Sequence, residues 1–339
     1  MRTPPGRCLW FCLLAACGDD SSSGVDAGRN DGGGGDGQVT TCAPGPGWVP
    51  APGVGNGPTQ ETAVVAFDGK LYVIGGFDET LAVLDTVQVF DTQTCTWSLG
   101  PTMPRAIHHA NAAVHGGRIY VLGAMESINF TTVGHVWSIA PGDTAWQVHA
   151  SMAAGQARAA GIAATIGDRI FLVGGLRNGS VAQTSAYEPA TDTWDTTFPP
   201  LPTNRDHGCG GAVGGTLYAT GGRATGIGSL QGEVYALTPG AGGWEARAPM
   251  PTARGGTACG VIGDRIVVVG GEGNGAIASG VFAEVESYVP ATNTWTEHDP
   301  MLTPRHGMGA AVIGNSLYVP GGATVQAFGA VDTFEILTF

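Results

Sequence analysis

Short apolar runs that end in glycine recur along the chain from Trp48 onward. The first glycines of successive runs are 47–51 residues apart. The six runs are Leu71–Gly76, Ile119–Ala124, Ile170–Gly175, Leu217–Gly222, Ile266–Gly271 and Leu317–Gly322. Runs this short, rich in β-branched and aromatic residues, favour buried strands over helices. No apolar pattern with a 3.6-residue period is sustained anywhere, so the sequence predicts minimal helix content.

Each period of the repeat predicts four strands. A strand of small residues, such as residues 309–313, comes first, and a tight turn such as Gly167-Asp168 leads into the apolar run. Glycine at such a turn suits the positive φ angles of a hairpin. A third strand follows the glycines, and a tryptophan marks the fourth strand. The tryptophans recur with the period of the runs, as Trp48, Trp97, Trp146, Trp194, Trp244 and Trp295.

Four-stranded units that recur at this period are typical of β-propeller blades. The order of apolar run, Gly-Gly, tyrosine-type residue and tryptophan, as in the stretch from Tyr187 to Trp194, resembles the kelch repeat. Only the second run departs from it, with Ala124 in place of the second glycine. The resemblance covers residues 42–339 and implies an all-β, six-bladed kelch-type propeller with four strands per blade.

The two ends of the repeat region predict how the ring closes. No tryptophan follows the sixth apolar run, and Trp48 has no strands of its own before it. A propeller must close, or its edge strands stay unpaired. We therefore expect the N-terminal strand around Trp48 to complete the last blade as its fourth strand.

The first 41 residues predict a targeting signal and a linker, not a folded domain. Leu9–Ala16 is an apolar run too short to span a bilayer, and it follows a basic start. The sequence Leu14-Ala15-Ala16-Cys17 resembles the lipobox of bacterial lipoproteins. This implies a signal peptide over residues 1–16, a lipidated Cys17 and a flexible tether up to residue 41. The expected location is the bacterial cell envelope, lipid-anchored at the outer membrane or cell surface.

Composition and charge narrow the function classes. The chain has 15 Lys plus Arg against 28 Asp plus Glu, a net charge of −13, and a single lysine. An acidic chain without a basic stripe argues against nucleic acid and leaves the lipid anchor as its membrane contact. Common catalytic motifs such as the phosphate loop and H-E-x-x-H are missing.

Tyrosine placement bears on one enzymatic class, the kelch-type copper radical oxidases. Their chemistry needs copper-binding tyrosines and a Tyr–Cys crosslink. All seven tyrosines here fall at repeat positions of the second and third strands, which explains them structurally. A copper radical oxidase is therefore disfavoured, and the sequence predicts no metal and no cofactor.

One repeat position is rich in arginine. Twelve residues before the six runs stand Thr59, Ile107, Arg158, Arg205, Arg254 and Arg305. In the kelch propellers that this chain resembles, arginines at this position lie near the mouth of the central channel and bind acidic partners. A guanidinium presents a planar fork that suits carboxylate or phosphate. The alternative is that these arginines hold neighbouring loops together.

The two positions after this one differ between blades, unlike the scaffold. Three of these residues, Glu61, His109 and His207, are expected to converge across the channel mouth, with Asp206, His108 and His306 beside them. Imidazole and carboxylate suit zinc binding or acid–base chemistry. The alternative is a polar, solvated channel entrance.

The cysteines beyond Cys17 are expected in two settings. Cys209 and Cys259 fall within first strands and are expected to be small buried apolar residues. Cys42 and Cys95 flank fourth strands of adjacent blades, where a disulfide would staple the ring closure. Spacing alone leaves the pairing open.

These observations favour a binding module over an enzyme. We expect a monomeric, envelope-anchored propeller that binds a protein, peptide or carbohydrate through its channel-mouth face. The alternative is a carbohydrate-active enzyme, such as a mutarotase similar to the kelch-type sialic acid epimerases, that uses Arg, Glu and His at the mouth. A third possibility is an envelope scaffold without a small ligand. The separation of Glu61, His109 and His207 distinguishes these: contact within about 5 Å, together with a bound ion, favours the enzyme.

Overall fold

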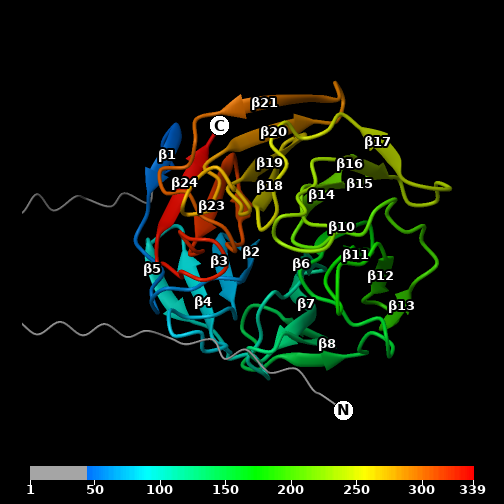
Figure 1. Cartoon of the computed structure of the whole chain (residues 1–339). Helices are drawn as coiled ribbons and strands as arrows, with labels where there is room; N and C mark the ends of the chain where they lie inside the picture. Colours follow the sequence, from blue (N-terminus) through cyan, green and yellow to red (C-terminus); the bar gives the residue numbers. More distant parts are fainter. Residues whose placement is uncertain (1–43) are drawn as a thin grey trace, which may run out of the picture. The chain divides into compact units, whose positions relative to one another are not determined.

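Six four-stranded antiparallel sheets make up the structure, a computed structural model that describes residues 44–339 (Figure 1). The first three blades contain β2 (Ala63–Phe67), β3 (Lys70–Ile74), β4 (Val87–Asp91) and β5 (Thr96–Leu99); β6 (Ala112–His115), β7 (Arg118–Glu126), β8 (Thr131–Ile139) and β9 (Gln147–His149); and β10 (Ile162–Ile166), β11 (Arg169–Val173), β12 (Thr184–Glu188) and β13 (Thr193–Asp195).

The other three blades repeat this order. They contain β14 (Cys209–Val213), β15 (Thr216–Thr220), β16 (Val234–Leu237) and β17 (Glu245–Arg247); β18 (Ala258–Ile262), β19 (Arg265–Val269), β20 (Val285–Val289) and β21 (Thr294–His298); and β22 (Ala311–Ile313), β23 (Ser316–Pro320), β24 (Phe334–Thr338) and β1 (Gly47–Pro50). The first strands of neighbouring blades contact one another around the whole ring. This confirms the predicted six-bladed, all-β propeller.

The ring closes through β1, as the sequence predicts. β1 pairs antiparallel with β24, and Trp48 lies opposite Leu337. The last blade therefore takes three strands from the C-terminal end of the chain and one from residues 47–50. In Figure 1 the blue β1 lies beside the red β24.

In five of the six blades a Gly-Gly pair with positive φ at both residues follows the second strand. In the first blade Gly75 and Gly76 have φ of 62° and 101°. A Cβ on Gly75 would lie 2.3 Å from the carbonyl oxygen of Ile107 in the next blade. Where Ala124 replaces the second glycine, the strand does not end: β7 and β8 extend to nine residues each, with a register shift between Leu122 and Ala124.

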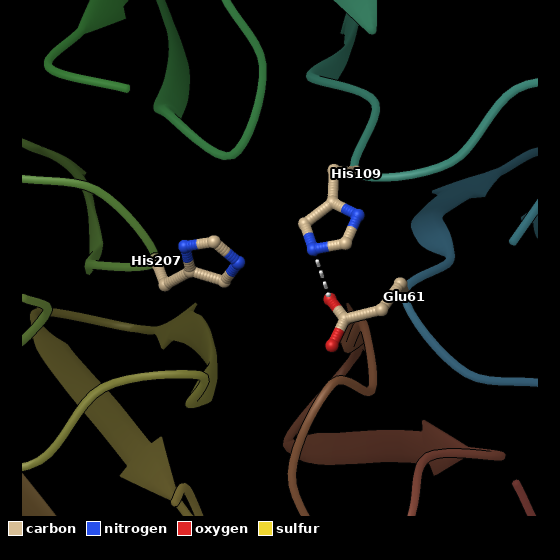
Figure 2. A group of neighbouring side chains, drawn as sticks. All are labelled: Glu61, His109 and His207. Carbon is tan, nitrogen blue, oxygen red and sulfur yellow. Dashed lines mark ion pairs between the residues drawn. The ribbon is translucent and has the colours of Figure 1, made fainter. Parts of the chain in front are cut away.

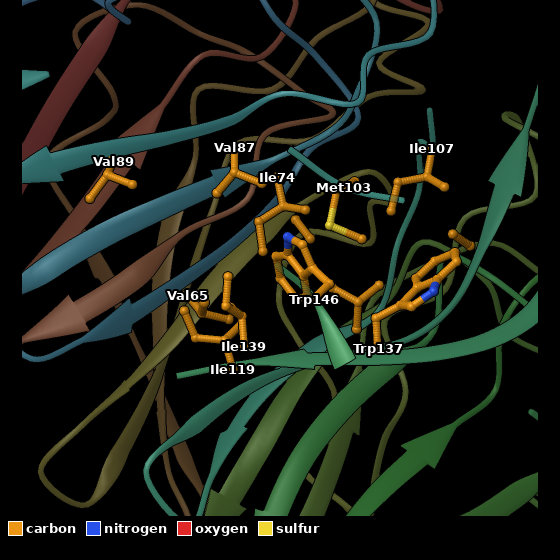
Figure 3. Close-up of a cluster of buried hydrophobic side chains, with 13 residues drawn as sticks. Val65, Ile74, Val87, Val89, Met103, Ile107, Ile119, Trp137, Ile139 and Trp146 are labelled. Atoms are coloured by element: carbon orange, nitrogen blue, oxygen red, sulfur yellow. The ribbon is translucent and has the colours of Figure 1, made fainter. Parts of the chain in front are cut away.

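Apolar side chains fill the space between neighbouring blades. Between the first two blades, Val65, Ile74 and Val87 pack against Ile119, Ile139 and Trp146 (Figure 3). Each repeat tryptophan also donates a hydrogen bond from its indole nitrogen to a backbone carbonyl of the preceding blade. The acceptors, for Trp48, Trp97, Trp146, Trp194, Trp244 and Trp295 in turn, are Asp299, Pro52, Pro101, Ala150, Pro199 and Ala248.

The expectation for one cysteine pair is wrong. Cys209 on β14 and Cys259 on β18 form a disulfide between the innermost strands of neighbouring blades, with Cα atoms 6.0 Å apart. The symmetry that stacks first strands side by side brings the two thiols together. Cys42 lies outside the described residues, so the Cys42–Cys95 bond stays a prediction, as do the signal peptide, lipidated Cys17 and tether of residues 1–41.

Candidate functional site

Six backbone segments form a closed ring of hydrogen bonds around the channel mouth. Each segment contributes the residue two positions after the arginine position of its blade, and each backbone N–H donates to the carbonyl of the preceding blade's residue at 2.5–3.0 Å. The members are Glu61, His109, Ala160, His207, Gly256 and Gly307. All six have φ between 48° and 66°. One residue of each blade is thereby fixed at the same height around the channel.

The positive φ at the ring positions means that any residue other than glycine is strained there. Glycine adopts that backbone conformation freely, as Gly256 and Gly307 do, whereas a residue with a Cβ is strained there by about 1–2 kcal/mol. Glu61, His109 and His207 nevertheless occupy three of the positions. Strain of this kind, held by the surrounding structure, is typical of functional sites.

These three side chains point toward one another across the mouth (Figure 2). Glu61 Oε2 lies 3.2 Å from His109 Nε2, and the rings of His109 and His207 are 4.9 Å apart between centroids. One donor atom from each residue lies within 4.8 Å of the other two. They line a cavity of about 130 Å³ to which all six blades contribute. The predicted convergence of the three residues is thus observed.

Hydrogen bonds determine which nitrogen of His109 carries the proton. His108 Nε2 lies 3.0 Å from the carbonyl oxygen of Ser127, so this nitrogen donates. Neutral His108 then accepts at Nδ1, which is 2.5 Å from His109 Nδ1. His109 therefore donates from Nδ1 and directs an Nε2 lone pair at Glu61. Burial lowers the pKa of both histidines, that of His108 to about 4, and keeps them neutral.

His207 is held in the same orientation by a carboxylate. Its Nδ1 lies 2.5 Å from Asp206 Oδ1 and donates to it, which leaves Nε2 facing the cavity. Asp206 also accepts from Ser180 and pairs with Arg223. Burial acts to raise the pKa of the Asp206 carboxyl, but these hydrogen bonds and the Arg223 charge outweigh it and keep the group ionised.

The charge around Glu61 is predominantly negative. Burial raises the pKa of the Glu61 carboxyl to about 7, and the neighbouring Glu272 adds to the shift. Opposing it, His306 Nδ1 lies 3.8 Å from Glu61 Oε1 and 3.6 Å from Glu272 Oε2. Arg223, which pairs with Glu272 at 2.8 Å, also acts to lower the pKa of Glu61. The buried site therefore gathers the carboxyl groups of Glu61, Asp206 and Glu272 beside Arg223 and His306, and these carboxyl groups can attract a further cation.

The four arginines at the repeat position do not line the channel mouth as anion-binding side chains, which is where we expected them. The side chains of Arg158, Arg205, Arg254 and Arg305 are buried, with at most 1% of each residue exposed. For Arg158, Arg254 and Arg305, Nε donates to the carbonyl of the first glycine of the same blade, 16 residues later, and Nη2 to the carbonyl 14 residues later. Arg205 reaches the carbonyl of Gly221 through Nη1.

The backbone of the arginine position joins neighbouring blades as well. Gly175 N–H donates to the Arg205 carbonyl at 2.7 Å, and Gly271 N–H donates to the Arg305 carbonyl at 2.9 Å. Two of the guanidinium groups have buried carboxylate partners, Glu286 for Arg254 and Glu335 for Arg305. The geometry therefore favours the alternative interpretation, in which these arginines hold neighbouring segments of the propeller together.

Apolar side chains at the mouth are a feature that the sequence analysis missed. Phe130 and Phe328 are 37% and 40% exposed, and each ring lies 6.1 Å from the buried ring of Phe77. Phe130 also lies 5.4 Å from the His109 ring. Phe130 lies in the turn between β7 and β8, and Phe328 lies in the loop after Gly321-Gly322; both are outside the repeat pattern, so spacing gave no signal for them.

We call the side of the propeller that carries these loops the mouth face, made of residues 75–86, 127–130, 174–183, 221–233, 270–284 and 321–333. Isolated bridges, such as Asp206 to Arg223 and Gly255 to Glu272, tie five of these loops to the ring segment of the blade, and in the second blade His108 is bridged to Met125 on β7. Five of the nine exposed large hydrophobic side chains among the described residues belong to the mouth face: Ile128, Phe130, Ile277, Val325 and Phe328.

The fold and this mouth define a class, the β-propeller with a polar pocket at one end of its channel. Comparison with known proteins gives the family: the KLHDC2/KLHL20/DRC7 kelch-repeats domain matches residues 47–222, and the kelch motif matches residues 253–301. The chain therefore belongs to the kelch-repeat family.

Similar proteins include members from fungi and animals. Kelch-like protein terF of Aspergillus terreus is 35% identical over 298 residues, which cover 83% of this chain and 64% of the relative. Kelch-like protein 36 of Bos taurus is 28% identical over 272 residues, 78% of this chain and 44% of the relative. The chain thus spans less than two thirds of each of these relatives.

Proposed function

We propose that this protein is a binding module that recognises a protein partner through its mouth face and is held on the bacterial cell envelope by a lipid on Cys17. Membership of the kelch-repeat family supports a binding role. The lipobox-like sequence before Cys17 supports the anchor. None of the described residues forms a helix of the length and apolar character needed to cross a bilayer.

The gathering of exposed apolar side chains on the mouth face carries this proposal. Exposed hydrophobic side chains that cluster beside a pocket mark interaction sites. Phe328 is held in place because Gln60 bonds the backbone of Ala327 and Gly329 on either side of it, at 2.8 Å each. The partner best suited to this surface is a protein loop that inserts an apolar side chain between Phe130 and Phe328.

The experiment replaces both phenylalanines and compares partner capture. The full chain and the F130S/F328S variant are used to capture partners from solubilised envelope proteins, with L99S as the matched control. Leu99 is a 65% exposed hydrophobic on β5, outside the mouth face. We expect a captured protein that is lost with F130S/F328S and retained with L99S. Equal capture by all three would contradict the proposal.

A second candidate function has its own observation. The Glu61 carboxyl, with a pKa raised to about 7, lies against the unprotonated Nε2 of His109 in a cavity. A carboxyl poised near neutrality is suited to general acid–base catalysis, as a sugar mutarotase or epimerase requires. The test follows the anomeric proton signals of freshly dissolved sugars, acidic ones included, by NMR. Faster equilibration that is lost with E61Q would support the enzyme, and rates equal to those in buffer would reject it.

A further inference from the structure

Three donor atoms at the mouth are directed at one point. His109 Nε2 and His207 Nε2 belong to imidazoles whose Nδ1 atoms donate to His108 and to Asp206. The Nε2 atoms therefore carry lone pairs, and that of His207 lies at the cavity without a hydrogen bond to another of residues 44–339. The third donor is the Glu61 carboxylate.

Both histidines make the hydrogen bonds from Nδ1 that typically orient metal-binding histidines. Such histidines donate their second ring nitrogen to a carboxylate, a carbonyl or another acceptor, which sets the tautomer and the ring direction. Here Asp206 plays that part for His207, and the His108 ring, fixed by the Ser127 carbonyl, plays it for His109. The contact with Glu61 explains the direction of His109 Nε2, but no side chain among residues 44–339 bonds to His207 Nε2, which faces the same point.

Distances and charge agree with a bound cation. Bonds of about 2.1 Å in a tetrahedral zinc site place ligand atoms about 3.4 Å apart. Glu61 Oε2 and His109 Nε2 are already 3.2 Å apart, and the other donor pairs lie within 4.8 Å, so they need to approach by at most about 1.4 Å. A cation between them also neutralises the excess of carboxylates formed by Glu61, Asp206 and Glu272.

We propose that Glu61, His109 and His207 form a binding site for a divalent first-row transition-metal ion, with zinc as the ion that fits best. Two imidazoles and one carboxylate suit such ions, whereas calcium and magnesium prefer sites made of oxygen alone. Three protein ligands leave an open position that faces the cavity of about 130 Å³. The proposal goes beyond the partner-binding function and does not depend on it.

Zinc binding by the purified full chain tests the site. After chelator treatment and removal of the chelator, ZnCl₂ is titrated by calorimetry into wild type, H207A, E61Q and H115A. His115, at the end of β6, is a histidine outside the ring and serves as the matched control. We expect one tight site in wild type and H115A, and affinity at least 100-fold weaker in H207A and E61Q, each checked for folding by circular dichroism. Equal affinity in all four proteins would overturn the proposal.

A second measurement keeps the proposal falsifiable if those variants do not fold. Cobalt(II) replaces zinc in the wild-type chain, and its visible absorption reports the coordination. Intense bands typical of four- or five-coordinate cobalt with nitrogen ligands support the site, whereas the weak spectrum of six-coordinate aqueous cobalt overturns it.

Asp206 acts as a positioning residue in this account. Loss of an outer partner of a metal-binding histidine weakens metal affinity about 10–100-fold. D206N is therefore expected to bind zinc 10–100-fold more weakly. S180A, which removes another hydrogen bond to Asp206, is expected to bind zinc like wild type and serves as its control. Unchanged zinc affinity in D206N would contradict the assigned role of Asp206.

Discussion

Replacement of a buried arginine that hydrogen-bonds only to other residues of the propeller should lower stability, whereas replacement of a ligand-binding arginine should not. Arg254 has no exposed surface, donates to the carbonyls of Gly270 and Val268, and pairs with buried Glu286. R254A leaves the buried Glu286 carboxylate without its cation, so we expect the free energy of unfolding to fall by about 3–5 kcal/mol. Denaturant titration measures this.

An exposed arginine near the same face supplies the control for R254A. Arg105 pairs with Glu126, and its side chain is 56% exposed. R105A is expected to cost less than about 1 kcal/mol. A similar small loss for R254A would mean that Arg254 does not brace the blade and remains a candidate for ligand binding.

Ala160 offers a test of the strained ring that is independent of any ligand. It has φ of 48°, and its side chain is only a methyl group. A160G removes the steric strain of a Cβ at positive φ, so we expect the protein to become more stable by about 1 kcal/mol. A163G, on the regular strand β10, is expected to cost about 0.5–1 kcal/mol. Denaturant midpoints that fall for both variants would show that the ring is not strained.

At the scale of elements, the closure strand carries the clearest prediction. Removal of β1 leaves the edge of β24 unpaired and deletes the indole hydrogen bond of Trp48 to Asp299. Deletion of residues 18–41 is expected to leave the melting temperature nearly unchanged, whereas deletion of residues 18–50 is expected to lower it markedly. C42S separates the strand from any disulfide at Cys42. Equal melting temperatures for the two deletions would contradict this role of β1.

The repeat pattern predicted the elements well because one periodic signal specifies strands, glycine turns and closure together. It failed where a blade breaks the pattern, since Ala124 lengthens the β7–β8 hairpin instead of ending it. It also missed the Cys209–Cys259 disulfide. Cys209 is the first residue of β14 and Cys259 is the second residue of β18, and the sequence does not show how far neighbouring first strands are shifted relative to each other.

Only part of the candidate site could be predicted from the repeat. Rotational symmetry brings equivalent positions of the six blades around one axis, and so the convergence of Glu61, His109 and His207 followed from the sequence. The direction of a side chain does not follow from symmetry. The arginines turn back to carbonyls of their own blades, and Phe130 and Phe328 come from loops that the repeat does not describe.

For the whole molecule, the proposed lipid anchor on Cys17 can be tested by fractionation of cells. Lipid chains on Cys17 would hold the protein on a membrane, since two or more acyl chains anchor stably and one does not. C17S is therefore expected to move the protein from the membrane fraction to the soluble fraction of lysed cells. C209S, which removes a cysteine of the propeller, serves as the control and should stay with the membrane. Retention of C17S in the membrane to the same extent as wild type would rule out the lipid anchor.

We propose a propeller that is a rigid frame, braced by buried arginines, and that presents a metal-binding pocket at its mouth. The most direct measurement is a crystal structure of the zinc-loaded protein with data collected at the zinc absorption edge. We predict one anomalous peak at the mouth, bonded to His109 Nε2, His207 Nε2 and the Glu61 carboxylate at about 2.0–2.2 Å. A mouth without anomalous signal in crystals that hold zinc elsewhere would contradict the account.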